Sequence, residues 1–295
     1  MGAVPRDPGE QGCKCRSPRD YDVVGSRQTH LYFDGEPLYS FGHGLSYTSF
    51  SYEELTVTED GDALEVTVTV TNSGARDGDE VVQLYARAVD PRVPRPHRAL
   101  VAHERRRLAA GQSGTFRFRV PRGELGHWDV AHGRWTVDPG TYVIEAGASS
   151  ADIRLGKEIT VDGPAPRPRP VLEVGLRAAD FDSAHSVSLV DLSRVSGDAV
   201  AAHEDVAGQL LYRGCDFGPA PGPGDVLVET AGGGGTVELH LPDGTTVAAV
   251  SVPATGGPYT YTATGGALAA RPTGVHDLHV TLRGALRLAR LGFCG

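Results

Sequence analysis

The sequence predicts an all-β chain of two antiparallel β-sandwiches joined by a proline-rich linker, and three observations carry this prediction. Apolar and polar residues alternate in both halves of the chain with the period of two that half-buried strands have. Residues that favour turns separate these short runs, which is typical of antiparallel sandwiches. Prolines alternate with other residues over 163–170, where no apolar pattern continues.

Length and composition exclude several classes of protein. The chain has 295 residues, of which 40% are hydrophobic, so it can build two cores. Its formal net charge of −9 and the lack of a basic stripe argue against nucleic acid as a partner. No apolar run approaches the roughly 18 residues of a membrane-spanning helix, so we expect no membrane partner. Abundant arginine with lysine only at positions 14 and 157 indicates a GC-rich bacterial gene.

The N-terminal segment and the cysteines point to no special chemistry. Residues 1–19 are polar and proline-rich, so they are not a secretory signal, and we expect a disordered leader or a start codon placed inside a longer gene. Localisation stays unassigned. Cys13 and Cys15 are too close for a CxxC pair, which favours free thiols and no metal site. A bridge between Cys215 and Cys294 would require neighbouring strands, a question that the sequence leaves open.

The stretch Tyr32–Phe50 reads as a structured loop. Three glycines permit unusual backbone conformations, and Pro37 fixes its own φ angle. Five aromatic residues lie between them, and ordered aromatic side chains bury most of their surface. We therefore expect this loop to dock against a large surface. In the chain alone, it should be poorly ordered or leave an exposed apolar patch.

Strands follow from residue 55 onwards. Each apolar run alternates with polar residues, as at Phe116, Phe118 and Val120, whose neighbours are arginines. Turn residues end the first run at Asn72-Ser73-Gly74, and a last strand is predicted over Ile153–Val161. The expected inward positions of the first run are Leu64, Val66, Val68 and Val70.

The second half is weakly patterned for its first forty residues, and alternation returns from Leu210. Gly232–Gly235 is predicted to be a hairpin turn, because no Lys-Ser/Thr follows as in a phosphate-binding loop. The period slips by one within the last strand, which a β-bulge near Ala289 would explain. We expect no cofactor. The apolar positions of successive strands are Val226 and Val228, Val237, Leu239 and Leu241, Val250 and Val252, and Leu278, Val280 and Leu282.

The first half resembles the end of glycoside hydrolase family 3 enzymes. The run from Tyr32 to Thr48 is similar to the segment that leads into the C-terminal domain of that family, with Ser40 where proline is usual. The resemblance implies a fibronectin type III-like, non-catalytic domain. Further residues that carry it are Val70-Thr71-Asn72-Ser73-Gly74, Gly78-Asp79-Glu80-Val81-Val82-Gln83-Leu84-Tyr85, Trp128-Asp129-Val130 and Gly147-Ala148-Ser149-Ser150.

Glycoside hydrolysis requires two positioned carboxylates. The resemblance implies that both lie in domains that precede this region in the family, so we expect no catalytic residue here. Gly44-Leu45-Ser46-Tyr47-Thr48 lacks the last glycine of a nucleophile elbow. His103-Glu104 and His203-Glu204 lack the second histidine of a zinc-protease helix.

The second half resembles carbohydrate-binding module family 6, a jelly-roll-like β-sandwich that binds sugar chains. The residues that carry this resemblance are Asp216-Phe217-Gly218, Val252-Pro253-Ala254-Thr255-Gly256-Gly257 and Gly274-Val275-His276-Asp277-Leu278. In this chain, Pro258 replaces the family's stacking aromatic and Arg287 replaces its asparagine. The two calcium-associated acidic positions fall on Ala179 and Ala289. If a site for an oligo- or polysaccharide survives, we expect it to use Tyr259, Arg287 and Tyr212; the alternative is that both tyrosines only pack the sandwich.

The predicted organisation is a leader with a boundary loop over 1–45, a fibronectin type III-like domain over 46–163, a linker over 164–173 and a module over 174–295. Two functions remain open. The chain is either the accessory C-terminal region of a family 3 β-glucosidase or β-xylosidase, truncated from its catalytic domains, or a free-standing carbohydrate-binding or adhesive protein. The loop at Tyr32–Phe50 favours the first, because a self-sufficient binding protein has no use for a docking loop.

Overall fold

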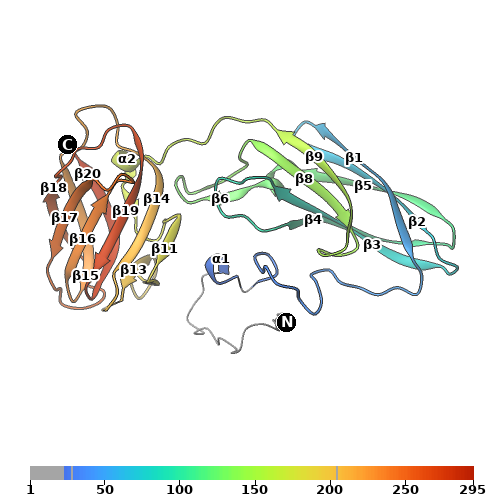
Figure 1. Cartoon of the computed structure of the whole chain (residues 1–295), viewed down its shortest axis with the longest axis horizontal. Coiled ribbons are helices and arrows are strands. Elements are labelled where there is room, and N and C mark those ends of the chain that lie inside the picture. The colour runs from blue at the N-terminus through green and yellow to red at the C-terminus, as the bar shows by residue number, and fades with distance from the viewer. Residues whose placement is uncertain (1–22, 28, 204) are drawn as a thin grey trace. The chain divides into compact units, whose positions relative to one another are not determined.

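The computed structural model describes residues 23–27, 29–203 and 205–295. They form an almost entirely β structure with two compact units (Figure 1). The first includes residues up to Trp128 and Trp135–Ala165, and the second includes Asp129–Arg134 and Pro166–Gly295. The predicted lack of fixed structure up to about Asp20 concerns residues outside the described ranges. The few helical turns are α1 (Val23–Ser26), α2 (Val171–Val174) and the short 3-10 helix Arg122–Leu125.

Two facing sheets make up the first unit. One has three strands in the order β1-β2-β5 and the other has four in the order β4-β3-β8-β9, with a separate ribbon of β6 and β7. This is the predicted immunoglobulin-type sandwich. The strands are β1 (Phe50–Asp60), β2 (Ala63–Asn72), β3 (Gly78–Ala88), β4 (Ala99–Leu108), β5 (Ser113–Pro121), β6 (His127–Asp129), β7 (Arg134–Thr136), β8 (Gly140–Gly147) and β9 (Ile153–Val161).

The alternation in the sequence explains the core of this unit. Val66, Val68 and Val70 of β2 are fully buried, and β5 pairs with β2 so that Phe116 and Phe118 lie opposite Val68 and Val66. Full burial of such a side chain contributes about 1.5–3 kcal/mol. The last predicted strand, Ile153–Val161, is β9 with the same bounds.

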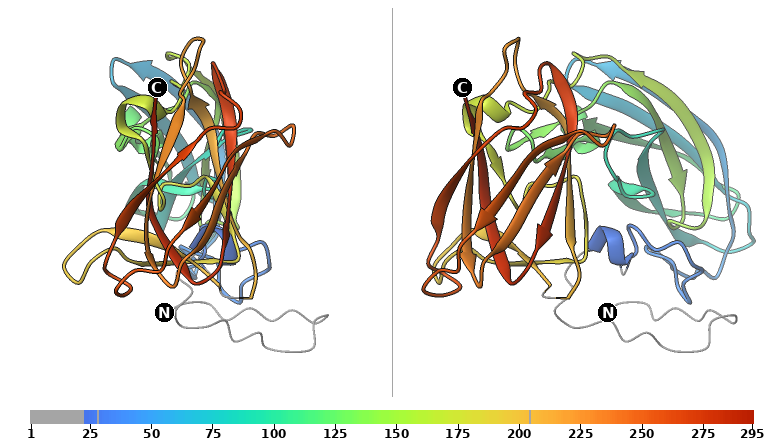
Figure 2. Two further views of the ribbon diagram at one scale, coloured as in Figure 1. Left: turned by 90° about the vertical axis from the view of Figure 1, so that its left-hand side faces the viewer. Right: turned by 60° about the vertical axis from the view of Figure 1, so that its left-hand side comes forward.

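A second sandwich forms the rest of the chain, shown from two other directions in Figure 2. One sheet has the order β12-β13-β20-β15-β18, with β10 also paired to β20, and the other has the order β11-β14-β19-β16-β17. Its strands are β10 (Leu176–Arg177), β11 (Ser183–His185), β12 (Val187–Asp191), β13 (Asp198–Ala202), β14 (Gly208–Asp216), β15 (Asp225–Gly232), β16 (Gly235–His240), β17 (Thr246–Val252), β18 (Thr262–Ala267), β19 (Val275–Arg283) and β20 (Leu286–Cys294).

The slip of period in the last strand is a β-bulge. On β15, Glu229 pairs with Arg290 and Thr230 pairs with Leu288, so Ala289 is the extra residue on β20. The bulge lets Leu286, Leu288, Leu291 and Phe293 all enter the core despite their change of parity. The predicted bulge near Ala289 is therefore confirmed.

The turn at Gly232–Gly235 is not the predicted hairpin. It leads from β15 in one sheet to β16 in the other, so it crosses between the layers. A Cβ atom on Gly235 would lie 1.9 Å from the carbonyl oxygen of Arg283, which only glycine avoids. Gly234 has a φ of +82°, and a Cβ atom on it would lie 2.8 Å from the backbone nitrogen of Ala254. Periodicity marks the turn, but not the sheet in which the chain continues.

The C-terminal end of the predicted linker, 164–173, contains residues that contact the second unit. Residues 162–168 are exposed, but Arg169 is only 4% exposed and Val171 lies in the second core. The backbone of Arg169 pairs with the strand at Cys215, and its guanidinium forms a buried ion pair with Asp182 at 2.9 Å. A single extended residue between two prolines can still pair with a strand, so the alternate prolines do not exclude the pairing of Arg169 with Cys215. Within the second unit, the fixed contacts of this segment therefore begin at Arg169.

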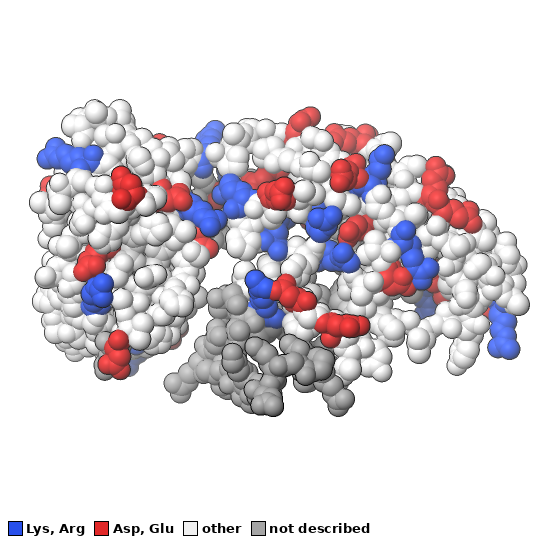
Figure 3. Space-filling view, viewed as in Figure 1, with Lys and Arg blue, Asp and Glu red and all other residues white. Residues whose placement is uncertain are grey.

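Among the described residues, no helix is long and apolar enough to cross a membrane. Charges of both signs are interspersed over the face of the first unit that Figure 3 shows, without an extended area of one sign. Cys215 is a buried free thiol, and burial raises its pKa to about 12. Cys294 is a free and exposed thiol on β20, so the bridge that the sequence left open does not form.

Candidate functional site

Two of the three sequence-predicted sugar-binding residues meet on the second unit. Tyr259 lies in the connection between β17 and β18, and Arg287 lies on β20. The guanidinium carbon of Arg287 is 5.3 Å from the centre of the Tyr259 ring. This distance is within the range of a cation–π interaction. Tyr259 remains 42% exposed, so part of its ring is accessible to a ligand.

The loop that carries Tyr259 is held in place by Thr255. Its backbone N–H donates to the carbonyl of Gly232 at 2.8 Å, and its hydroxyl accepts from the N–H of Gly232 at 2.9 Å. Thr260 adds a turn, because its N–H donates to the carbonyl of Gly257 at 3.1 Å. The Thr-Gly-Gly run thus fixes the loop that carries Tyr259, which lies one residue after Pro258, the position where the resemblance puts the stacking aromatic.

Sequence reasoning missed Arg194, which approaches the same ring. It lies on the connection between β12 and β13, and its guanidinium carbon is 6.0 Å from the ring centre of Tyr259. Ser193 shapes this connection, because its hydroxyl accepts from the N–H of Ser196 at 3.0 Å. The surrounding forty residues have little periodicity, and no local pattern distinguishes Arg194 from other surface arginines.

Tyr261 also belongs to this group, which we call the Tyr259 cluster: Arg194, Tyr259, Tyr261 and Arg287. Burial raises the pKa of Tyr261, and the nearby guanidinium of Arg287 opposes that rise. The hydroxyl of Tyr261 is shielded and makes no hydrogen bond of good geometry among the described residues. Its closeness in sequence to Tyr259 was the one signal that could have suggested it.

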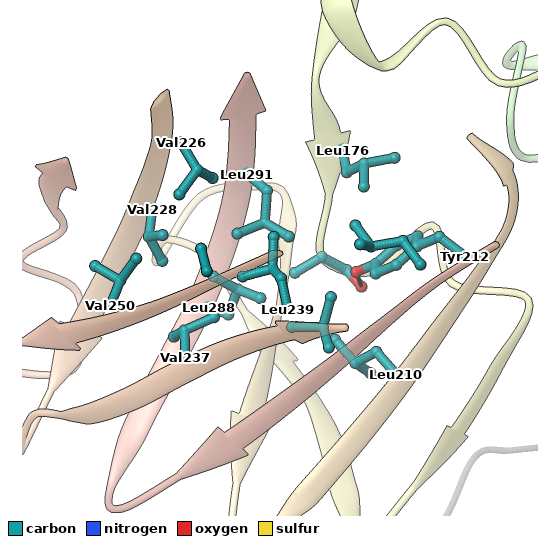
Figure 4. Packing of buried hydrophobic residues seen from close by; sticks show 14 of the residues in the cluster. Leu176, Leu210, Tyr212, Val226, Val228, Val237, Leu239, Val250, Leu288 and Leu291 are labelled. Carbon is teal, nitrogen blue, oxygen red and sulfur yellow. Dashed lines mark hydrogen bonds between the residues drawn. The ribbon is translucent and has the colours of Figure 1, made fainter. Parts of the chain in front are cut away.

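Tyr212 is the third predicted residue, and its assignment to a sugar site is corrected by its position. Its side chain is fully buried in the core near Leu176 and Leu210 (Figure 4). The hydroxyl donates to the carbonyl of Ala178 at 2.9 Å, and burial raises its pKa. A residue with no exposed surface cannot stack on a ligand. The sequence carried the signal, since Tyr212 has the same strand parity as the apolar Leu210.

The positions that the resemblance associates with calcium do not fit a metal. Ala179 and Ala289 have methyl side chains without oxygen ligands. Within the described ranges, no group of three or more His, Cys, Asp or Glu side chains could hold a metal ion.

A second candidate site is the loop at Tyr32–Phe50, whose residues before Phe50 form neither helix nor strand. Its backbone is tied to the first unit. Gln83 of β3 is 5% exposed and donates from its side-chain nitrogen to the carbonyls of Gly42 at 3.0 Å and Ala148 at 2.7 Å. The carbonyl of Phe41 accepts from the N–H of Ser150 at 2.9 Å. The loop is therefore anchored at its centre.

Its large side chains nevertheless point away from the first unit. Leu45 and Tyr47 are each 94% exposed, Tyr39 is 71% exposed and Leu38 is 63% exposed. Phe41 is less exposed, because it stacks on His30 with ring centres 4.3 Å apart. The expected exposed apolar patch is present on a loop whose backbone is fixed.

Comparison with known families agrees with both halves of this description. Residues 80–150 match the model of the fibronectin type III-like domain, and residues 177–293 match that of carbohydrate binding module family 6. The chain carries both of these domains. The fibronectin type III-like domain lies in the first unit with the loop, and the family 6 module carries the Tyr259 cluster.

The relatives of the chain are family 3 β-glucosidases. It is 43% identical over 127 residues to a β-glucosidase of Rhizobium radiobacter, an alignment that covers 42% of this chain and 16% of the relative. A solved family 3 β-glucosidase of Bifidobacterium adolescentis is 32% identical over 50% of this chain and 22% of its own, with a TM-score of 0.46. DesR, a β-glucosidase of Streptomyces venezuelae solved with D-glucose, is 36% identical over 55% of this chain and 22% of its own, with a TM-score of 0.48.

The fraction of each relative's length that this chain covers bears on its function. The chain spans between 16% and 20% of the length of the curated relatives it matches. A fibronectin type III-like domain and a carbohydrate-binding module, homologous to β-glucosidases over this fraction alone, fit a non-catalytic accessory region.

Proposed function

We propose that this chain acts as the non-catalytic C-terminal region of a family 3 β-glycosidase of the β-glucosidase or β-xylosidase type. In this proposal its first domain docks against the catalytic domains, and its family 6 module binds an oligo- or polysaccharide through the Tyr259 cluster. The observation that carries the proposal is the loop at Tyr32–Phe50, which combines a fixed backbone with exposed apolar side chains.

The physical reason is the cost of leaving that surface in water. Apolar area gains about 25 cal/mol per Å² when it is removed from water, and Leu45 and Tyr47 are almost fully exposed. A mobile linker could bury such side chains against itself, but the bonds from Gln83 and Ser150 hold this backbone in place. A large partner surface next to the loop would cover the patch. In a free-standing adhesive protein, no catalytic domain would be present to cover this loop.

For sugar binding, the cluster offers an aromatic ring and several donors. The accessible part of the Tyr259 ring can stack on the apolar face of a pyranose, and Arg287 can donate to ring hydroxyls. Stacking and a few fixed polar groups are what a shallow saccharide site requires. The residues proposed for binding are therefore Tyr259 and Arg287, with Tyr212 removed from the set.

Docking is tested with a chimera. Residues 32–163 replace the matching region of the Rhizobium radiobacter β-glucosidase, which should fold and hydrolyse aryl β-glucosides, whereas the 295-residue chain alone should not hydrolyse aryl β-glucosides or β-xylosides. The double variant Leu45→Ser/Tyr47→Ser should lower the melting temperature of the chimera but not that of the chain alone. Arg117→Ala, an exposed change on β5, serves as the control. A chimera whose melting temperature is unchanged by the double substitution would contradict docking through this loop.

Sugar binding is tested by titrating the full chain with xylo- and gluco-oligosaccharides in a calorimeter. Binding should be lost in Tyr259→Ala and retained in Tyr259→Phe, because a phenyl ring keeps the stacking face. Binding that is unchanged in Tyr259→Ala would refute this site.

A further inference from the structure

The Tyr259 cluster contains two arginines that form no ion pair within the described part of the chain. Arg194 and Arg287 both approach the Tyr259 ring, at 6.0 and 5.3 Å. No carboxylate of the described residues lies within 4.0 Å of either guanidinium, whereas some other arginines, such as Arg119, Arg154 and Arg169, have carboxylate partners. The best protein acceptor for Arg287 is the backbone carbonyl of Asp191, at a long 3.5 Å.

Acidic residues outnumber Lys and Arg by 37 to 28, so carboxylates to pair with are abundant. Arg194 lies on the connection between β12 and β13 and Arg287 lies on β20, far apart in sequence, yet both approach the ring of Tyr259. The ring attracts both guanidiniums by cation–π interaction, and N–H groups that form no ion pair with a described carboxylate remain to bind a ligand.

The chemistry of the guanidinium then selects the ligand. It has five N–H donors and no acceptor, so it can donate to a neutral hydroxyl but cannot accept a hydrogen bond from it. A carboxylate or a sulfate ester presents only acceptor oxygens, and arginine binds such groups with paired, charge-assisted hydrogen bonds. The amide that the family places at position 287 can donate and accept, and its replacement by arginine removes the acceptor.

We infer that the Tyr259 cluster binds an acidic saccharide, whose carboxylate or sulfate is held by Arg194 and Arg287 while a neighbouring sugar ring lies against Tyr259. This inference rests on the proposed saccharide-binding function of the same site and specifies its ligand. Because the protein as a whole is negatively charged, attraction for the ligand is local to this cluster. Binding should therefore weaken as salt is added.

The test compares pairs of ligands with and without an acidic group. The full chain is titrated with trigalacturonate and its methyl ester, with xylotriose with and without a glucuronosyl branch, and with sulfated and unsulfated galactan oligosaccharides. We expect the acidic member of at least one pair to bind about tenfold or more tightly than its neutral counterpart. Whether the uronates or the sulfated galactan bind identifies the source of the charge, and either result supports the inference.

Variants assign the preference to the two arginines. Arg194→Gln and Arg287→Asn should each reduce the preference for the acidic ligand, and Arg287→Asn should keep binding to neutral sugars because it restores an amide. Arg213→Gln is the matched control, since Arg213 is exposed on β14 and its side chain forms no ion pair in the described structure. Far-UV circular dichroism checks that each variant is folded.

The outcomes separate the inference from the function on which it rests. Equal binding of neutral and acidic members, lost in Tyr259→Ala, would leave the saccharide site in place and overturn the acidic specificity. A preference that persists in both arginine variants, or that falls equally in Arg213→Gln, would also overturn it. Lack of binding to every saccharide would refute both the site and its specificity.

Discussion

Glu80 is a buried carboxyl whose ionisation opposes folding. It is 7% exposed on β3 and accepts a hydrogen bond of 2.7 Å from the hydroxyl of Tyr52. Burial is the largest influence and raises its pKa, against the smaller opposing effects of Tyr52 and Arg154. Because the folded state then binds this proton more tightly than the unfolded state, the stability it contributes is present at low pH. That contribution is lost as pH rises through the folded pKa.

We expect Glu80→Gln to remove this dependence. The stability of the wild-type first domain should fall, relative to that of the variant, as pH rises from below the ordinary carboxyl range through the raised pKa. Urea unfolding at a series of pH values measures this, followed by tryptophan fluorescence, since both tryptophans of the chain lie in its first half. Glu59→Gln, an exposed change on β1, should leave the pH profile as in the wild type. Parallel pH profiles for Glu80→Gln and the wild type would contradict the assignment.

The ion pair between Arg169 and Asp182 is deeply buried, with side chains that are 4% and 7% exposed. Asp182 also accepts from the N–H of Arg213 at 2.7 Å, so it joins the start of the second unit to β14. Asp182→Asn keeps the size but leaves the guanidinium buried without a counter-charge. We expect a loss of about 3–5 kcal/mol in the free energy of unfolding of the second unit.

Chemical denaturation of the full chain, followed by hydrogen exchange of peptides from β14 and β19, measures this loss. The control is Glu238→Gln, which breaks the more exposed pair with Arg283 and should cost no more than about 1 kcal/mol. Equal effects of the two substitutions would show that burial does not set the strength of the Arg169 pair.

At the scale of elements, the loop at Tyr32–Phe50 is a segment whose backbone and side chains have different partners. Its backbone bonds are satisfied within the first unit by Gln83 and Ser150. Its large apolar side chains remain exposed, and exposed apolar patches promote association. The chain alone should therefore self-associate as its concentration rises.

We expect Leu45→Ser/Tyr47→Ser to shift the chain toward the monomer in sedimentation velocity experiments. Val195→Ser removes an isolated valine that is 93% exposed on the second unit, and it should have no effect on association. A wild-type chain that stays monomeric at high concentration would count against the patch as an adhesive surface, as would equal effects of the two variants.

At the scale of the whole molecule, the two units have separate cores, and the exposed residues 162–168 connect them. Limited digestion with proteinase K should release two stable fragments, cut within this exposed segment. The C-terminal fragment should retain Arg169, because its backbone and side chain are both bound in the second unit. Mass spectrometry of the fragments decides this: a fragment that begins after Val171, or a single protected core across the segment, would contradict the division.

Some features of this protein follow from the sequence by itself because they depend on the local backbone period. Successive side chains of a strand point to opposite faces, so alternation alone identified the inward row of β2, the bounds of β9 and the bulge at Ala289. The glycines and aromatics of the Tyr32–Phe50 loop likewise indicated a docking surface, since their composition is costly in a solvated linker.

Other features were decided only by the tertiary structure, because they depend on which distant segments meet. Alternate prolines could not show that Arg169 ends in a buried ion pair, and Arg194 has no local pattern that leads it to Tyr259. Tyr212 and Tyr259 are both aromatic residues next to strands or within them, yet closure of the two sheets buries one and leaves the other accessible. Periodicity fixes the face of a strand on which a side chain lies, whereas packing of the layers decides whether that face meets a core, a partner or a ligand.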